Sequence, residues 1–162
     1  SVSVAAVCDG WPVVAAVFDP ATDSMFTTST GSDTQLNSSK ISVSNDELNK
    51  LTSFAVDNKI PEEFEMPARK IMNACRFRNL GTTAMHLAYI AKGSLVGAIT
   101  SSPALWDIAA GYLLIKNAGG IVTDFKGNEI FPVDTESYEG QRFEILATNK
   151  KSREQVAGLL DL

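Results

Sequence analysis

Asp107 is the acidic residue whose place in the sequence best fits a chemical role. It is the only acid between Leu105 and Ile115, and it lies in the first turn of an apolar helix that the sequence predicts directly after a strand. One interpretation is that its carboxylate complements the partial positive charge of the helix N-terminus, which contributes about 0.3 to 1 kcal/mol. The other is that it projects from the carboxyl end of a sheet, where α/β folds place ligands, and binds a hard cation through oxygen. The pattern alone leaves both open.

A second candidate is Gly81-Thr82-Thr83, which precedes another predicted helix. Free N–H groups at a helix start can hold an anion or a ligand hydroxyl, although capping by the Thr82 side chain is the simpler interpretation. His86 is the only histidine and lies off the apolar stripe of that helix, which favours a packed or surface imidazole over a catalytic base. A Ser-His-Asp triad would have to use it, yet the sequence has no G-x-S-x-G motif.

Charge and cysteine content narrow the classes of partner. The net charge of -5 disfavours binding to nucleic acid or to an anionic membrane, and it suits a small ligand or a metal. Cys8 and Cys75 form no C-x-x-C motif, so neither a zinc site nor a disulfide framework is indicated, and we expect a reducing, cytoplasmic setting. No stretch approaches the roughly 20 apolar residues that cross a bilayer.

The elements that must position these residues begin with a hairpin. Two β-rich runs, 2–8 and 12–18, flank Asp9-Gly10, and a D-G between apolar runs is a strong hairpin signal. A third strand over 24–28 would complete a meander. Ser44-Asn45-Asp46-Glu47 matches a capping box, which predicts a short helix through Lys50.

From residue 51 onward predicted strands and helices alternate, which indicates a layered α/β fold with a mixed sheet and flanking helices. The Trp11 and Trp106 side chains are expected in core or edge packing. Ser102-Pro103 is expected to cap and open the helix that carries Asp107. The predicted strands are 51–56, 75–80, 95–99, 121–125 and 143–147, and the predicted helices are 61–74, 84–91, 103–117 and 150–162.

Several motifs resemble one known family. The run Leu105-Trp106-Asp107-Ile108-Ala109-Ala110-Gly111, followed by Ala118-Gly119-Gly120-Ile121-Val122-Thr123-Asp124, resembles the C-terminal signature of the inositol monophosphatase family. Its W-D-x-A-A-G and A-G-G spacing is specific. Leu80-Gly81-Thr82-Thr83-Ala84 is similar to the family's helix start, and further similarity in 17–27 and 88–97 extends the resemblance over nearly the whole chain.

The resemblance implies a magnesium-dependent, lithium-sensitive phosphomonoesterase. Within it, Asp107 would bind the second catalytic metal, and Gly81, Thr82 and Thr83 would line the alcohol portion of the substrate. The family fold is a five-layer αβαβα sandwich. Residues 1–44 would then be closing antiparallel strands of the N-terminal half, and 45–162 the C-terminal α/β half.

Three departures from the family pattern limit this inference. The D-P-x-D-G-T motif, which supplies further metal carboxylates, is absent from the 162 residues, and so is the upstream family glutamate. Many inositol-cleaving members have an acidic residue seven positions before the metal aspartate, where this chain has Thr100. We expect that the natural chain begins earlier than Ser1 and that these residues alone are nearly inactive.

The leading hypothesis is therefore that the chain is part of a Mg²⁺-dependent hydrolase of a small phosphomonoester, an inositol or sugar phosphate. Its expected partners are a phosphorylated metabolite and either a second copy, forming a homodimer, or the upstream segment, which would cover exposed apolar surface. One alternative is a non-catalytic remnant that acts as a binding or scaffold domain. Others are family members acting on fructose bisphosphate, a 3′-phosphoadenosine nucleotide or histidinol phosphate.

Overall fold

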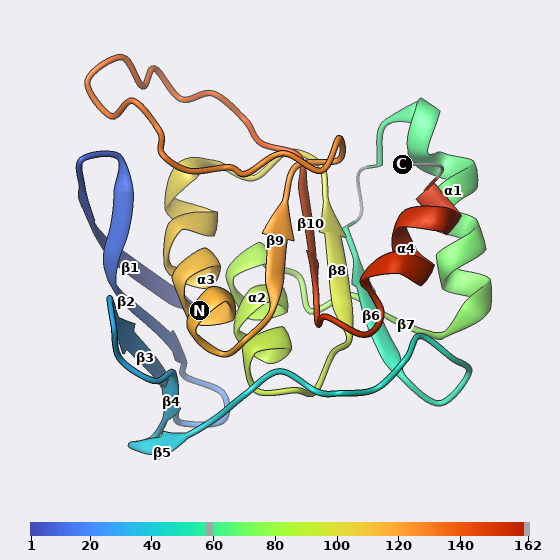
Figure 1. The fold of residues 1–162 in the computed structure, drawn as a ribbon, viewed down its shortest axis with the longest axis horizontal. Helices are drawn as coiled ribbons and strands as arrows, with labels where there is room; N and C mark the ends of the chain where they lie inside the picture. Colours follow the sequence, from blue (N-terminus) through green and yellow to red (C-terminus); the bar gives the residue numbers. More distant parts are fainter. Residues whose placement is uncertain (58–59, 161–162) are drawn as a thin grey trace.

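The computed structural model describes residues 1–57 and 60–160, which form four layers (Figure 1). An antiparallel sheet from the first 40 residues packs on two helices, these pack on a second, mixed sheet, and two further helices cover the far side of that sheet. This arrangement confirms the α/β class and the mixed sheet with flanking helices. In the described residues, no helix is long and apolar enough to cross a bilayer.

The first sheet is a meander in the order β1-β2-β3-β4-β5. The predicted hairpin is confirmed, because Asp9 and Gly10 both have positive φ, 49° and 78°, as a two-residue turn of this kind requires. Its β1 is an edge strand of this sheet. The strand bounds are β1 Val2–Cys8, β2 Trp11–Asp19, β3 Ser24–Ser29, β4 Gln35–Leu36 and β5 Ser39–Lys40.

The second sheet has the order β7-β6-β8-β10-β9. In it β6 pairs in parallel with both β7 and β8, whereas β10 runs antiparallel to β8 and β9. The carboxyl ends of β6, β7 and β8 therefore meet at one edge of the sheet. The bounds are β6 Ser53–Val56, β7 Arg76–Arg78, β8 Gly97–Thr100, β9 Ile121–Thr123 and β10 Ile145–Thr148.

Four helices complete the described residues. Helices α2 (Thr83–Ala91) and α3 (Leu105–Asn117) lie between the two sheets, and most of their residues are buried. Helices α1 (Glu62–Ala74) and α4 (Arg153–Leu160) pack together on the outer face of the second sheet. The sequence left an interruption at Pro67 open, and the structure shows α1 continuing through that residue.

Close packing of α2 against α3 holds the two central helices in place. A Cβ built on Gly111 of α3 would lie 2.5 Å from two side-chain atoms of Leu87, which is fully buried in α2. Such a distance is far below van der Waals contact, so the glycine permits the approach of the two helices. The N-termini of both helices point toward the same edge of the second sheet as the carboxyl ends of its parallel strands.

Three sequence predictions are wrong in detail. Residues 44–50 form no helix, because the Ser44 hydroxyl and the Asp46 carbonyl both accept hydrogen bonds from the Asn149 side chain, at 2.9 Å each, which holds this segment against the second sheet. The helix carrying Asp107 begins at Leu105, two residues later than expected. Trp106 does not enter the core, since 61% of its surface is exposed.

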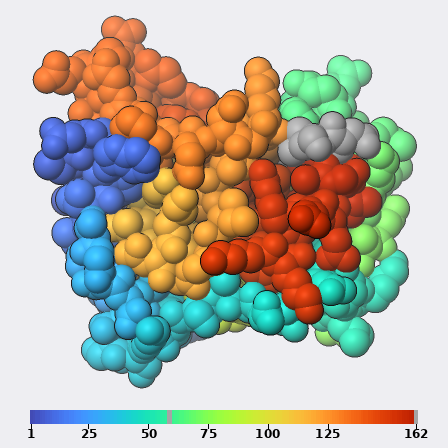
Figure 2. Space-filling view, viewed as in Figure 1, coloured from blue at the N-terminus to red at the C-terminus, as the bar shows by residue number. Residues whose placement is uncertain are grey.

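A long loop between β9 and β10 crosses the N-terminal end of α3 and reaches the first sheet. The Val133 N–H donates to the Gly10 carbonyl at 3.0 Å, so the loop contacts the tip of the β1–β2 hairpin. Figure 2 shows this loop, in orange, as a protruding lobe directly beside the blue hairpin. The loop therefore joins the two sheets along one side of the molecule.

His86 is the most deeply buried titratable group on the inner helices. Its ring is fully buried, and its Nε2 accepts the Leu80 N–H at 2.9 Å. Burial lowers the pKa of His86 below its usual range, and the facing Asp57 carboxylate opposes this only in part. Of the two placements that the sequence left open, packed or surface, the structure shows the packed one.

We expect the same substitution to have opposite effects at two helical glycines. Gly111→Ala should destabilise the fold by about 1 to 3 kcal/mol, because the added methyl overlaps Leu87. Gly158→Ala in α4 is the matched control: its Cβ would meet nothing within 4 Å, so higher helix propensity should stabilise the fold by about 0.5 to 1 kcal/mol. Urea denaturation of both variants measures the difference. A neutral or stabilising Gly111→Ala would contradict the close packing.

We also expect stability to depend on the protonation of His86. Because its pKa is lower in the folded chain than in the unfolded chain, the unfolded chain binds more protons as the pH falls below about 6.5, and stability is lost over that range. In His86→Gln the amide oxygen can still accept the Leu80 N–H but cannot titrate. Between pH 7.5 and 5.5 the wild type should therefore lose more free energy of unfolding than this variant. Equal losses would show that His86 does not titrate on unfolding.

Candidate active site

A polar pocket of about 550 Å³ lies where the carboxyl ends of the parallel strands meet the start of the two inner helices. Residues following β6, β7 and β8 form one side, and the first residues of α2 and α3 form the other. Crevices at the carboxyl ends of parallel strands are where α/β proteins place their ligands. The pocket is lined by Asp57, Asn79, Gly81, Thr82, Thr83, Ser101, Ser102, Pro103, Asp107 and Arg142.

Asp107 lines this pocket and has one oxygen already in use. Its Oδ2 accepts the Ala104 N–H at 2.9 Å, which caps the start of α3 and explains why the helix begins at Leu105. Among the described residues, none donates a hydrogen bond to Oδ1 and none forms an ion pair with this carboxylate. Both interpretations of the sequence are thus compatible in one side chain, since capping occupies one oxygen and leaves the other for a ligand.

Gly81, Thr82 and Thr83 line the same pocket as Asp107. Gly81 has a φ of 77°, and this left-handed conformation turns the chain from β7 into α2. Thr82 occupies the N-cap position of α2, but its hydroxyl makes no capping hydrogen bond and lies 3.3 Å from the Ser1 hydroxyl instead. The interpretation of Thr82 as a side-chain cap is therefore wrong.

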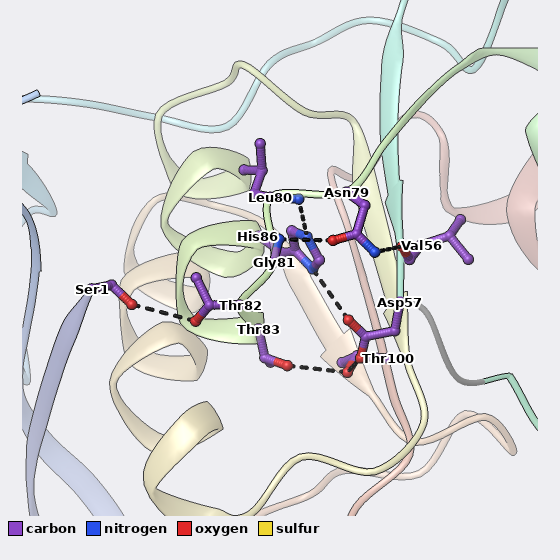
Figure 3. A network of polar contacts seen from close by, with 10 residues as sticks. All are labelled: Ser1, Val56, Asp57, Asn79, Leu80, Gly81, Thr82, Thr83, His86 and Thr100. Carbon is purple, nitrogen blue, oxygen red and sulfur yellow. Dashed lines mark hydrogen bonds and ion pairs between the residues drawn. The ribbon is translucent and has the colours of Figure 1, made fainter. Parts of the chain in front are cut away.

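Asp57 is a pocket residue that sequence reasoning missed. It directly follows β6, and its carboxylate accepts a hydrogen bond from Thr100, the last residue of the neighbouring β8 (Figure 3). Its side chain is 26% exposed, whereas the facing His86 is fully buried. The signal that could have found it is its position directly after the predicted strand 51–56. Residues that follow adjacent parallel strands lie at the same edge of the sheet.

Arg142 contributes a positive charge that no sequence pattern predicts at this pocket. It comes from the loop before β10, and its guanidinium donates to the Ser102 carbonyl at 3.4 Å. Since 42 residues of sequence separate it from Thr100, no local pattern indicates that it lies at the pocket. A guanidinium at the rim can attract and orient an anionic group such as a phosphate.

The pocket offers oxygen ligands suited to Mg²⁺ but only part of a site. Within residues 1–57 and 60–160, no three His, Cys, Asp or Glu side chains lie close enough to hold a metal together. Mg²⁺ is usually bound through one or two carboxylates, several waters and substrate phosphate oxygens. The free Oδ1 of Asp107 fits one such position.

Comparisons with known proteins agree on one family. The model of the inositol monophosphatase family matches residues 1–161. A "Nus factor SuhB" from Xylella fastidiosa is 35% identical over 85% of this chain and 52% of its own length. An "Inositol-1-monophosphatase" from Mesorhizobium japonicum is 32% identical over 80% of this chain and 51% of its own length. The chain spans about half the length of these curated relatives.

A solved structure shows the same fold. The crystal structure of the extragenic suppressor protein suhB from Bartonella henselae superposes with a TM-score of 0.84 and 28% identity, covering 98% of this chain and 60% of that one. The match therefore includes both sheets and the four helices described above. On the family match and this fold, the chain belongs to the inositol monophosphatase family.

Proposed function

We propose that the full-length protein is a Mg²⁺-dependent phosphatase of a small phosphomonoester, and that these residues supply one metal ligand and one wall of the substrate site. The observation that carries the proposal is the pocket itself. It brings Asp107, with a free carboxylate oxygen, together with Gly81, Thr82 and Thr83. The name of the Mesorhizobium japonicum relative supports the same reaction class.

Each of the named residues has a distinct part in this proposal. Asp107 would hold a Mg²⁺ ion through Oδ1, while its capping bond fixes the direction of the carboxylate. The chemistry that such an ion supplies is a lower pKa for an attacking water and neutralisation of charge on the leaving oxygen. The start of α2 presents N–H groups and two threonine hydroxyls that can bind the alcohol part of the substrate. Arg142 would attract the phosphate.

A second candidate function, binding to another protein without catalysis, is favoured by two observations. Several curated relatives carry the name "Nus factor SuhB". In addition, β1 and the start of α3 expose an apolar surface, which we define by Val2, Val4 and Trp106, exposed by 57%, 60% and 61%. We propose that a phosphatase would use this surface to pack against the upstream segment or a second copy. A cytoplasmic location remains a prediction.

Replacing Asp107 tests the enzymatic proposal in the full-length protein. In Asp107→Asn the amide oxygen can still accept the Ala104 N–H, so the helix cap is kept while the negative charge is lost. We expect kcat for inositol 1-phosphate at millimolar magnesium to fall about 100-fold or more. Asp33→Asn is the control, because Asp33 forms a surface ion pair with Lys40 and does not line the pocket.

Three outcomes would contradict the proposal. Wild-type turnover by Asp107→Asn would remove this carboxylate from the reaction, and brisk turnover by residues 1–162 alone would show that no further carboxylates are needed. If the folded full-length protein hydrolyses no small phosphomonoester with magnesium, the protein-binding function is the better account.

A further inference from the structure

Asp57 is held by a network that the proposed metal site does not require. One carboxylate oxygen, Oδ2, accepts the Thr100 hydroxyl, and the other, Oδ1, lies 3.8 Å from Nδ1 of His86 (Figure 3). The backbone gives the reason for this placement. Val56 pairs with Ile99 in parallel strands, so the next residues, Asp57 and Thr100, lie side by side at the strand ends.

The hydrogen bond to His86 Nε2 determines where the histidine proton lies. Because Nε2 accepts the Leu80 N–H at 2.9 Å, that nitrogen carries no proton, and the neutral ring must carry its proton on Nδ1. Nδ1 is fully buried and makes no hydrogen bond with any described residue. Its N–H dipole faces Asp57 Oδ1, and this attraction steadies the carboxylate without closing a hydrogen bond.

The adjacent hydroxyls also have an assigned direction. The single Thr100 proton goes to Asp57, so in the pair of Thr83 and Thr100 hydroxyls, 3.2 Å apart, the proton must come from Thr83. Both threonine protons are therefore used inside the protein. These three side chains therefore offer a ligand only acceptors, the Asp57 carboxylate and the lone pairs of the Thr83 oxygen.

We propose that Asp57 is a specificity-determining residue, which binds a hydroxyl group on the alcohol portion of the substrate beside the Thr83 oxygen. This inference rests on the proposed phosphatase function and adds one residue that recognises the alcohol portion of the substrate. A row of acceptors is matched by a ligand that presents several hydroxyl donors. Each hydroxyl hydrogen-bonded to a carboxylate is a charge-assisted contact, which is stronger than a neutral one.

The rest of the lining suits an alcohol rich in oxygen better than a nucleotide. Ser101, Ser102 and Thr82 carry hydroxyls at the same pocket. Of the described residues that line it, none has an aromatic ring on which a nucleotide base could stack.

The test compares two substrates in the full-length protein at millimolar magnesium. Inositol 1-phosphate presents five hydroxyls on its alcohol portion, whereas phenyl phosphate presents none. In Asp57→Asn the amide oxygen can still accept the Thr100 hydroxyl, but the charge and one acceptor are lost. We expect kcat/KM for inositol 1-phosphate to fall roughly tenfold or more relative to kcat/KM for phenyl phosphate, with the difference in KM and not in kcat. Asp33→Asn should leave kcat and KM for both substrates unchanged.

The outcomes separate this inference from the proposed function. If the wild type cleaves both substrates and Asp57→Asn loses kcat equally on both, Asp57 acts in the reaction or in stability and the specificity inference is overturned. If the wild type cleaves neither, the phosphatase function fails and the inference fails with it.

A second measurement needs no variant and covers the case in which Asp57→Asn does not fold. Free inositol and cyclohexanol are compared as competitors of phenyl phosphate hydrolysis by the wild type. Inositol should inhibit at a concentration at least tenfold lower than cyclohexanol. Equal inhibition would show that the pocket does not recognise hydroxyl donors.

Discussion

The parallel pairing of β6 with β8 is the constraint on which the candidate site depends. With Val56 opposite Ile99, both strands end at one level, and the residues that follow them enter a common pocket. The inner helices start at that same edge. They also pack closely, with Gly111 of α3 against Leu87 of α2, which fixes their starts relative to each other. A slip of one residue in the register of β6 would turn Asp57 to the other face of the sheet and break its contact with Thr100.

The two pocket carboxylates differ in what surrounds them. Asp107 accepts the Ala104 N–H at the start of α3 through one oxygen and keeps the other oxygen free, which suits it to bind a cation. Asp57 is bonded to a hydroxyl and faces a buried imidazole, so its orientation is set by neutral groups. In the proposed function, Asp107 would bind the ion and Asp57 the uncharged alcohol.

The sequence predicted the elements whose signals are local. The hairpin at Asp9-Gly10, the spans of the inner helices and the position of Asp107 in a first helical turn all follow from neighbouring residues. The capping box at Ser44 misled, because its hydroxyl accepts a bond from Asn149, 105 positions away. Asp57 and Arg142 were missed for the same reason, since strand pairing and a long loop bring them to the pocket.

Thr100 shows how such non-local contacts change an inference. By the family resemblance, many inositol-cleaving members have an acid at this position. In the structure its hydroxyl binds the Asp57 carboxylate, so an acid still lies at this place, supplied by the neighbouring strand. The missing acid at Thr100 is thus accompanied by an acid at Asp57, and only the pairing of the strands shows that the two residues are neighbours.

The most direct test of the central claim, that Asp107 holds a catalytic divalent ion in this pocket, is a crystal structure of the full-length protein with Mn²⁺ in place of Mg²⁺, solved at the manganese absorption edge. We expect an anomalous peak about 2.1 Å from Asp107 Oδ1, with Oδ2 still bonded to the Ala104 N–H. Saturating Mn²⁺ that leaves this oxygen without a metal, or binds only elsewhere, would contradict the account.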